Sequence, residues 1–208
     1  MAVLFPPEEF AKLKTQLVVY NCALKNMTTR LDILLDDFSN LQKNNPIEHV
    51  KYRLKSPESI VAKLHRQGHP LTVDSAKKHL NDIAGVRCIC PYTKDITYIA
   101  EVLKKQLDMK VISEKDYVNN PKPSGYRSYH LIFDVPVYLS DKEKHIPVEV
   151  QIRTQSMDFW ATLEHKARYK YQDEMPTHLA HELQECAAKI AELDDRMILI
   201  QELVDIAY

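Results

Sequence analysis

Two long stretches of heptad-spaced apolar residues, one near each end of the chain, constrain the fold most. In both, apolar residues recur three or four positions apart, as they do along one face of an α-helix. We therefore predict a long helix at each end, the first ending at Asn44-Asn45-Pro46 and the second following Pro176. The apolar positions are Phe10, Leu13, Leu17, Tyr20, Leu24, Met27, Leu31, Leu34, Phe38 and Leu41 in the first, and Leu179, Leu183, Cys186, Ile190, Leu193, Met197, Ile200 and Val204 in the second.

An apolar helix face of this length needs a partner. The two helices can pack on each other, on the region between them, or on another subunit, and the sequence leaves these three options open. Together they carry more apolar surface than a small central domain can cover, which favours an oligomer.

The region between them alternates helix and strand signals. Ser56 and Pro57 have the character of an N-cap and first helical residue, so we predict a helix to about Arg66. Further helices are expected at 73–82, 96–107 and 158–171, and strands at 85–90, 110–117, 128–137 and 146–154. This pattern predicts an α/β (α+β) domain with a mixed sheet. The expected divisions are an N-terminal helical arm at 1–44, the central domain at 45–175 and a C-terminal helix at 176–208.

Composition narrows the function classes. The chain of 208 residues has a formal net charge of −1, so cations must act locally rather than attract nucleic acid over a long range. No apolar run approaches the ~18 residues of a transmembrane helix, and no signal peptide is evident. The four cysteines, of which Cys88 and Cys90 fill strand positions, form no CxxC pair and no zinc pattern. We expect a cytoplasmic protein with reduced thiols.

Glycine is scarce, with only Gly68, Gly85 and Gly125. Neither GxxxxGK[ST] nor GxGxxG occurs, so the sequence indicates no P-loop and no dinucleotide fold. Any bound phosphates must be held by side-chain cations and a metal ion.

Residues 148–153 alternate strictly between apolar and polar. If this segment is a strand, one face carries Glu149, Gln151 and Arg153. Glu149 can bind a metal or accept a proton, Gln151 can contact a base edge, and Arg153 can pair with phosphate. The alternative is the solvated face of an edge strand.

The segment Lys122–His130 combines a flexible turn with aromatic and basic side chains. Gly125 allows a tight turn, and Tyr126 after it can stack on a purine. Lys122, Arg127 and His130 add donors for phosphate oxygens. The alternative for Tyr126 is that it fills the core.

A second basic cluster surrounds the helix that begins at Ser56, and a solvated surface is the alternative reading for it. Arg87 interrupts an apolar strand, and a cation there needs a partner, for which Asp82 is a candidate. Asp82 and Glu149 together would make a two-carboxylate Mg²⁺ site. The basic residues of this cluster are Lys51, Arg53, Lys55, Lys63 and Arg66.

These motifs, in this order, resemble the synthetase domain of the RelA/SpoT family, and specifically its single-domain small alarmone synthetases. The resemblance covers roughly residues 45–175. It implies a mixed-sheet domain of nucleotidyltransferase-like type and assembly as a homotetramer. Larger family members have a hydrolase domain with a His-Asp metal motif. No His-Asp dipeptide occurs in this sequence, so we do not expect hydrolase activity. The motifs that carry it are Glu48–Ile60, Asp82–Arg87, Lys122–His130, Glu149–Thr154 and Met157–His165.

The resemblance implies transfer of the β,γ-pyrophosphate of ATP to the 3′-hydroxyl of GDP or GTP, which gives AMP and ppGpp or pppGpp. By motif position, Asp82 and Glu149 would bind Mg²⁺, and Glu149 would also help to deprotonate the 3′-hydroxyl. Adenine would lie between Arg53 and Arg87, and guanine would stack on Tyr126. RNA binding is compatible with the sequence but is not indicated by it. The implied ATP-binding residues are Arg53, Lys55, Lys63, Arg66 and Arg87, and the implied GDP/GTP-binding residues are Lys122, Tyr126, Arg127, His130, Gln151, Arg153 and Asp158.

One position departs from part of the family. Some small synthetases have asparagine where this chain has Asp158, although a carboxylate can still accept hydrogen bonds from guanine N1 and N2. We expect guanine recognition to persist, with the balance between GDP and GTP open. Two alternatives from other classes are a catalytically reduced nucleotide- or RNA-binding module, and a helical scaffold with a relic domain.

Overall fold

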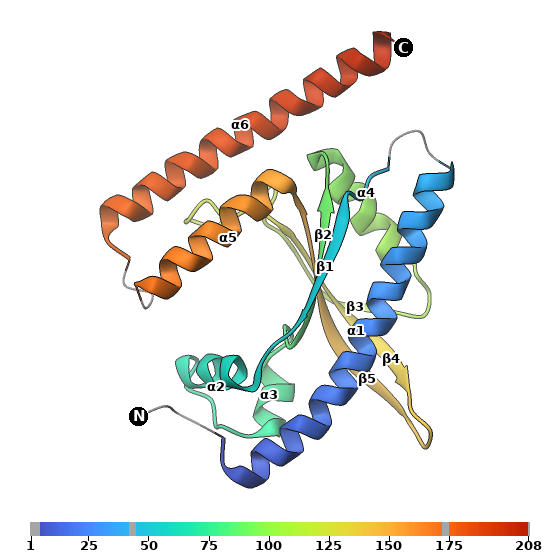
Figure 1. Ribbon diagram of the computed structural model, residues 1–208, viewed down its shortest axis with the longest axis vertical. Helices are drawn as coiled ribbons and strands as arrows, with labels where there is room; N and C mark the ends of the chain where they lie inside the picture. Colours follow the sequence, from blue (N-terminus) through green and yellow to red (C-terminus); the bar gives the residue numbers. More distant parts are fainter. Residues whose placement is uncertain (1–4, 42–44, 172–174, 208) are drawn as a thin grey trace.

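A mixed five-stranded sheet forms the centre of the computed structural model, which describes residues 5–41, 45–171 and 175–207. The strand order is β1-β2-β5-β4-β3 (Figure 1). β2 and β5 run parallel, and every other neighbouring pair is antiparallel. The predicted fold class is therefore confirmed. The strands are β1 (His49–Leu54), β2 (Ala84–Cys90), β3 (Lys110–Asp116), β4 (Tyr129–Tyr138) and β5 (Glu143–Thr154).

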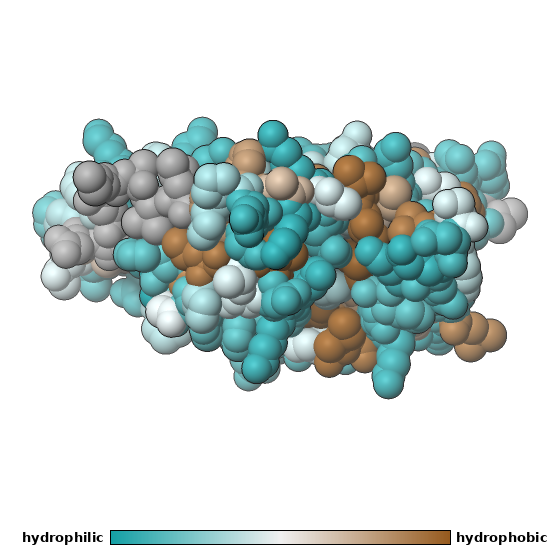
Figure 2. All heavy atoms as spheres, turned by 90° about the horizontal axis from the view of Figure 1, so that it is seen from below, coloured by the Kyte–Doolittle hydropathy of each residue, from teal (hydrophilic) through white to brown (hydrophobic). Residues whose placement is uncertain are grey.

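The N-terminal helix covers one face of this sheet. α1 (Pro7–Leu41) crosses the strands, and α4 (Thr93–Lys104) packs on the same sheet. On the apolar face of α1, Leu13, Leu24, Met27 and Leu31 are at most 3% exposed. This row of apolar residues, the N-terminal seam, therefore packs within the chain. Seen from below, the molecule shows mostly hydrophilic side chains, with the hydrophobic ones in separate patches (Figure 2).

The remaining helices leave the middle of the other face uncovered by helix. α2 (Pro57–Arg66) and α3 (Val73–His79) lie toward one end, and α5 (Gln155–Lys170) lies toward the other (Figure 1). Polar residues of β1, β2, β4 and β5 point toward the space between them.

The C-terminal helix α6 (Thr177–Ala207) packs beside α5. Trp160 of α5 donates its indole N–H to the carbonyl of Leu183 at 2.8 Å, and Ala187 is buried there. Farther along, the seam residues Leu193 and Ile200 are 51% and 52% exposed. The chain therefore leaves the apolar row of α6 exposed from Leu193 onward. In the part of the chain that the structure describes, no helix is both long and apolar enough to cross a membrane.

Most expected elements are confirmed, with three differences. The helix expected at 96–107 spans Thr93–Lys104 instead. The helix predicted at 73–82 ends at His79, because Leu80 adopts an extended backbone and is fully buried. Asp82 consequently lies in the connection that leads into β2. Strand β1 was not predicted, since its alternating cations read as a charged run. Leu41 is the last residue of α1, while Asn44, predicted to end that helix, lies outside the described residues.

Candidate functional site

The strand register places the predicted polar residues in adjacent rows on the uncovered face of the sheet. In one row, Arg53 of β1 pairs with Gly85 of β2, which pairs with Glu149 of β5. Val148, Val150 and Ile152 are fully buried on the opposite face, which confirms the predicted alternation. The next row contains Lys51, Arg87, Gln151 and His130.

Two adjacent cavities open on this face. The first, of about 270 Å³, is lined by Lys51, Tyr52, Arg53, Gly85, Val86, Arg87, Glu149 and Gln151. The second, of about 390 Å³, is lined by Arg53, Arg87, Lys122, Ser124, Tyr126, His130, Gln151, Arg153, Ala161, Glu164, His165 and Arg168. Arg53, Arg87 and Gln151 belong to both. A shared wall of this kind suits two ligands that react with each other. We call the cavities the donor cavity and the acceptor cavity.

Asp82 lies among cations at the edge of the site. Its Oδ2 accepts hydrogen bonds from Lys55 Nζ at 2.6 Å and Lys63 Nζ at 2.7 Å. Burial alone would raise the pKa of Asp82, but the two ammonium groups outweigh it and hold the pKa below its ordinary value. Burial lowers the pKa of Lys55, although the charge of Asp82 opposes this. The second carboxylate oxygen, Oδ1, is buried and has no hydrogen-bond partner.

Glu149 is held at both of its oxygens. Oε1 lies 3.2 Å from His130 Nδ1, and Oε2 accepts a hydrogen bond from Gln151 Nε2 at 2.7 Å. Burial is the largest influence and would raise the pKa of Glu149, but the hydrogen bond and charge of His130 and the hydrogen bond from Gln151 together outweigh it, so the pKa lies below its ordinary value. The negative charge of Asp82 acts in the opposite direction, as expected for two carboxylates of one site.

The segment Lys122–Ser128 forms one wall of the acceptor cavity. Gly125 has a φ of +90°, and its N–H donates to the carbonyl of Lys122 at 2.8 Å. The ring of Tyr126 makes edge contacts with Tyr117 and His130, and Lys122 Nζ lies 4.9 Å from its centroid.

Arg127 is turned away from both cavities. Its Nε donates to the carbonyl of Val118 at 3.2 Å, and its guanidinium lies 3.9 Å from the carboxylate of Asp194 in α6. The structure likewise places Lys55, Lys63 and Arg66 outside the lining of both cavities.

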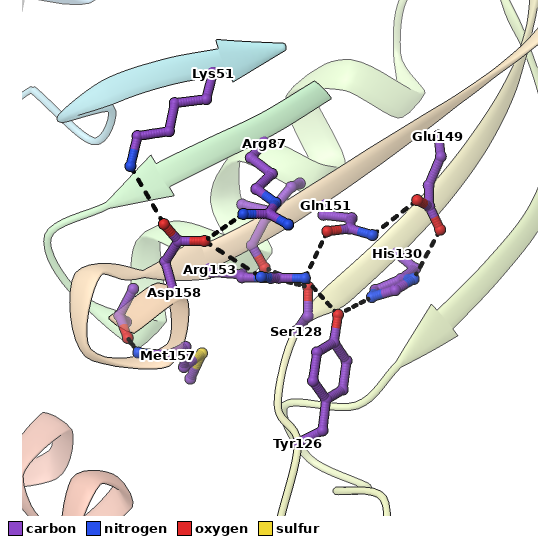
Figure 3. Close-up of polar contacts among 12 residues, drawn as sticks. Lys51, Arg87, Tyr126, Ser128, His130, Glu149, Gln151, Arg153, Met157 and Asp158 are labelled. Carbon is purple, nitrogen blue, oxygen red and sulfur yellow. Dashed lines mark hydrogen bonds and ion pairs between the residues drawn. The ribbon is translucent and has the colours of Figure 1, made fainter. Parts of the chain in front are cut away.

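Asp158 and Arg153 form a buried ionic centre (Figure 3), and Arg153 also lines the acceptor cavity. Asp158, which is 7% exposed, lies 3.3 Å from cationic nitrogens of Lys51, Arg87 and Arg153. It contributes to the lining of neither cavity. Burial lowers the pKa of Arg153, while Tyr126 and Asp158 raise it, and a guanidinium remains charged at neutral pH.

Several lining residues were not predicted as site residues. Lys51 belongs to the strand that was missed, where alternation with Arg53 was the available signal. Glu164, which forms an ion pair with Arg168 one turn later on α5, also lies beside the acceptor cavity. Their i, i+4 spacing was visible, but spacing alone does not place a helix face against a cavity.

The two carboxylates fit a magnesium ion. Mg²⁺ is commonly bound through one or two carboxylates, with substrate phosphates and water as its other ligands. Asp82 Oδ1 is a buried oxygen without a hydrogen-bond partner. Glu149 is ionised, and the negative charge of Asp82 acts on its pKa, so the two carboxylates lie in one site. Within the described ranges, no three His, Cys, Asp or Glu side chains gather as a metal site.

Two adjoining cavities on a mixed sheet, lined by cations and by Glu149, are the arrangement expected of a transferase that acts on phosphorylated ligands. Residues 52–174 match the region found in RelA/SpoT proteins. The chain is 45% identical over 192 residues to the GTP pyrophosphokinase YwaC of Bacillus subtilis, covering 92% of this chain and 91% of that protein. The chain belongs to the RelA/SpoT family.

Solved structures agree with this assignment. Small alarmone synthetase 1 from Bacillus subtilis bound to its product pppGpp superposes with a TM-score of 0.88 at 34% identity, over 94% of this chain and 99% of that one. The same enzyme bound to AMPCPP superposes with a TM-score of 0.81 at 33% identity, over 94% and 98% of the two chains.

Proposed function

We propose that this chain transfers the β,γ-pyrophosphate of ATP to the 3′-hydroxyl of GDP or GTP and so produces AMP and ppGpp or pppGpp. The observation that carries the proposal is the pair of cavities with a shared wall and an ionised Glu149 beside it. The similarity to a synthetase with structures bound to pppGpp and to AMPCPP supports both halves of the site.

The donor cavity would hold ATP. Arg53 and Arg87 line it, and their flat guanidinium groups can stack on the two faces of adenine. Lys55 and Lys63, which pair with Asp82 and lie outside the cavity lining, would bind the triphosphate by turning away from that carboxylate. Arg66 follows Lys63 by three residues on α2 and would add a further charge.

A magnesium ion held by Asp82 and Glu149 would neutralise the polyphosphate and make its β-phosphorus easier to attack. The chain's own residues would then align the reactants. Tyr126 would stack on guanine, and Lys122 would bind the acceptor's 5′-phosphates. Glu149 would take the proton of the 3′-hydroxyl while the 3′-oxygen forms a bond to the β-phosphorus of ATP. The bond between the β-phosphorus and the α-phosphate oxygen would break at the same time, which releases AMP.

Assembly would use the exposed half of α6. Its apolar residues Leu193, Met197, Ile200 and Val204 are each 43% to 52% exposed, and we propose that they bind other copies of the chain in a homotetramer.

The function is tested by incubating purified protein with ATP, GDP and Mg²⁺ and separating the nucleotides by anion-exchange chromatography. We expect AMP and ppGpp in equal amounts. Glu149→Gln should lower the rate by about 10²–10⁴-fold, as for loss of a general base. Glu143→Gln, on the same strand but near His145, is the matched control and should keep full activity. Absence of AMP and ppGpp from the wild-type reaction contradicts the proposal.

A further inference from the structure

Arg153 differs from the other cations of the site because it is almost completely buried. Its side chain is 3% exposed. Nε donates to Ser128 Oγ at 3.1 Å, and one terminal nitrogen lies 3.3 Å from Asp158 Oδ1. The other terminal nitrogen donates to Tyr126 Oη and Gln151 Oε1, both at 2.5 Å. A guanidinium has five N–H groups, so these four hydrogen bonds leave at most one for a ligand.

The hydrogen bonds to Tyr126 and Gln151 belong to a closed ring of five side chains (Figure 3). One arm runs from Arg153 through Gln151 to Glu149 Oε2. The other runs from Arg153 to Tyr126, from Tyr126 Oη to His130 Nε2 at 2.8 Å, and from His130 Nδ1 to Glu149 Oε1. Each oxygen of Glu149 is therefore reached by one arm, and both arms begin at the same guanidinium.

The chemistry of arginine sets the direction of both arms. A guanidinium can only donate, so Gln151 must turn its carbonyl oxygen to Arg153 and its NH₂ group to Glu149. On the other arm, the Tyr126 oxygen accepts from Arg153 and its hydroxyl proton is left for His130 Nε2. A neutral His130 then carries its own proton on Nδ1 and donates it to Glu149.

We propose that Arg153 is a positioning residue for the general base, which fixes the amide orientation of Gln151 and the tautomer of His130 so that both oxygens of Glu149 accept hydrogen bonds. Asp158 supplies the counter-charge that keeps the guanidinium in place. The acceptor's phosphates are bound by other cations. Since the base acts in the chemical step, loss of Arg153 lowers kcat and leaves KM for GDP and ATP little changed.

The inference rests on the proposed function, and the experiment separates the two. If wild-type protein makes no AMP or ppGpp, the proposed function fails. If wild-type protein is active, steady-state kinetics of Arg153→Ala test the inference alone. We expect kcat to fall about 100-fold, with both KM values within about threefold of wild type. Lys122→Ala, which removes a predicted phosphate ligand from the same cavity, should instead raise KM for GDP.

Chemical rescue distinguishes positioning from structural support. Arg153 lines the acceptor cavity, so a small cation can enter the space left by Arg153→Ala. Millimolar guanidinium should restore kcat at least about tenfold, whereas ammonium, which lacks the planar fork, should not. Arg153→Lys should lose kcat like Arg153→Ala for the same reason.

A second variant keeps the inference testable if Arg153→Ala does not fold. Tyr126→Phe retains the ring that would stack on guanine and removes only the hydroxyl of the histidine arm, so we expect about a tenfold lower kcat with KM for GDP unchanged. The inference is overturned if Tyr126→Phe keeps wild-type kcat. It is also overturned if Arg153→Ala raises KM for GDP tenfold with kcat unchanged, or if guanidinium restores nothing to folded Arg153→Ala.

Discussion

Gly125→Ala tests whether α6 supports the acceptor wall. A Cβ atom at Gly125 would lie 2.5 Å from Ala187 Cβ and 3.8 Å from Trp160 Cζ2. Carbon atoms pack best at about 3.5–4.0 Å, so the segment or the helix must move by about 1 Å. Gly68 provides a matched control, because its φ of +70° is also positive but an added Cβ there would have no atom within 4 Å.

The two substitutions should differ in both stability and kinetics. A positive φ costs a non-glycine residue about 1–2 kcal/mol, which is the whole expected cost of Gly68→Ala. Overpacking adds about 1–3 kcal/mol at Gly125, so Gly125→Ala should cost about 2–5 kcal/mol. Because Tyr126 follows directly, a displacement of ~1 Å should lower kcat/KM for GDP by about 10–100-fold. KM for ATP should stay within about twofold.

Chemical denaturation and steady-state kinetics with each nucleotide varied measure these effects. The second-site change Ala187→Gly removes the opposing methyl group, so it should return the overpacking part of the lost stability and part of the GDP kinetics. If Gly125→Ala has the same GDP kinetics as Gly68→Ala, then α6 does not position this segment and the reasoning is refuted.

Three further predictions follow from burial and charge. Asp82→Asn removes a carboxylate of the proposed metal site, so activity should require at least about tenfold more Mg²⁺, measured by titration; an unchanged Mg²⁺ requirement would exclude this role. Gly85→Val should fold, because an added Cβ meets only ordinary contacts at 3.9 and 4.0 Å, but its bulk in the donor cavity should raise KM for ATP about tenfold and spare KM for GDP. Leu31→Ala, at a fully buried position, should lower the unfolding free energy by about 2–5 kcal/mol. Leu193→Lys, at an exposed position, should lower the unfolding free energy of the monomer by less than about 0.5 kcal/mol and instead reduce the oligomer mass measured by sedimentation.

Local patterns were sufficient to predict most of the elements. The capped helix at Ser56 is confirmed, since the Ser56 side chain accepts a hydrogen bond from the N–H of Ser59. The alternation around Glu149 placed the acid and the amide on one face correctly. Period and capping are local properties, so they can be read from a single sequence.

The rest depends on contacts between distant segments. β1 was missed because Lys51 and Arg53 read as a charged run, whereas in the sheet they face the donor cavity. The burial of Arg153 was not foreseen either. Ser128 lies 25 residues before it, directly before the neighbouring strand β4, and only the folded sheet brings the two side chains together.

The C-terminal helix shows a third kind of limit. Its apolar periodicity predicts a seam, but the same pattern is compatible with packing inside the chain or against another subunit. Only the structure distinguishes the first half, where Ala187 is buried, from the second, where Ile200 is 52% exposed.

The central claim is that the 3′-hydroxyl of a guanine nucleotide attacks ATP in a site built around Glu149. It is tested most directly by offering 2′-deoxy-GDP and 3′-deoxy-GDP as acceptors with ATP labelled in the β-phosphate. The account predicts a labelled guanine product and equimolar AMP with 2′-deoxy-GDP, and no labelled guanine product with 3′-deoxy-GDP. It also predicts transfer to 2′-deoxy-GDP that is about 10²–10⁴-fold slower for Glu149→Gln. Labelled product from 3′-deoxy-GDP, or undiminished transfer to 2′-deoxy-GDP by Glu149→Gln, would contradict it.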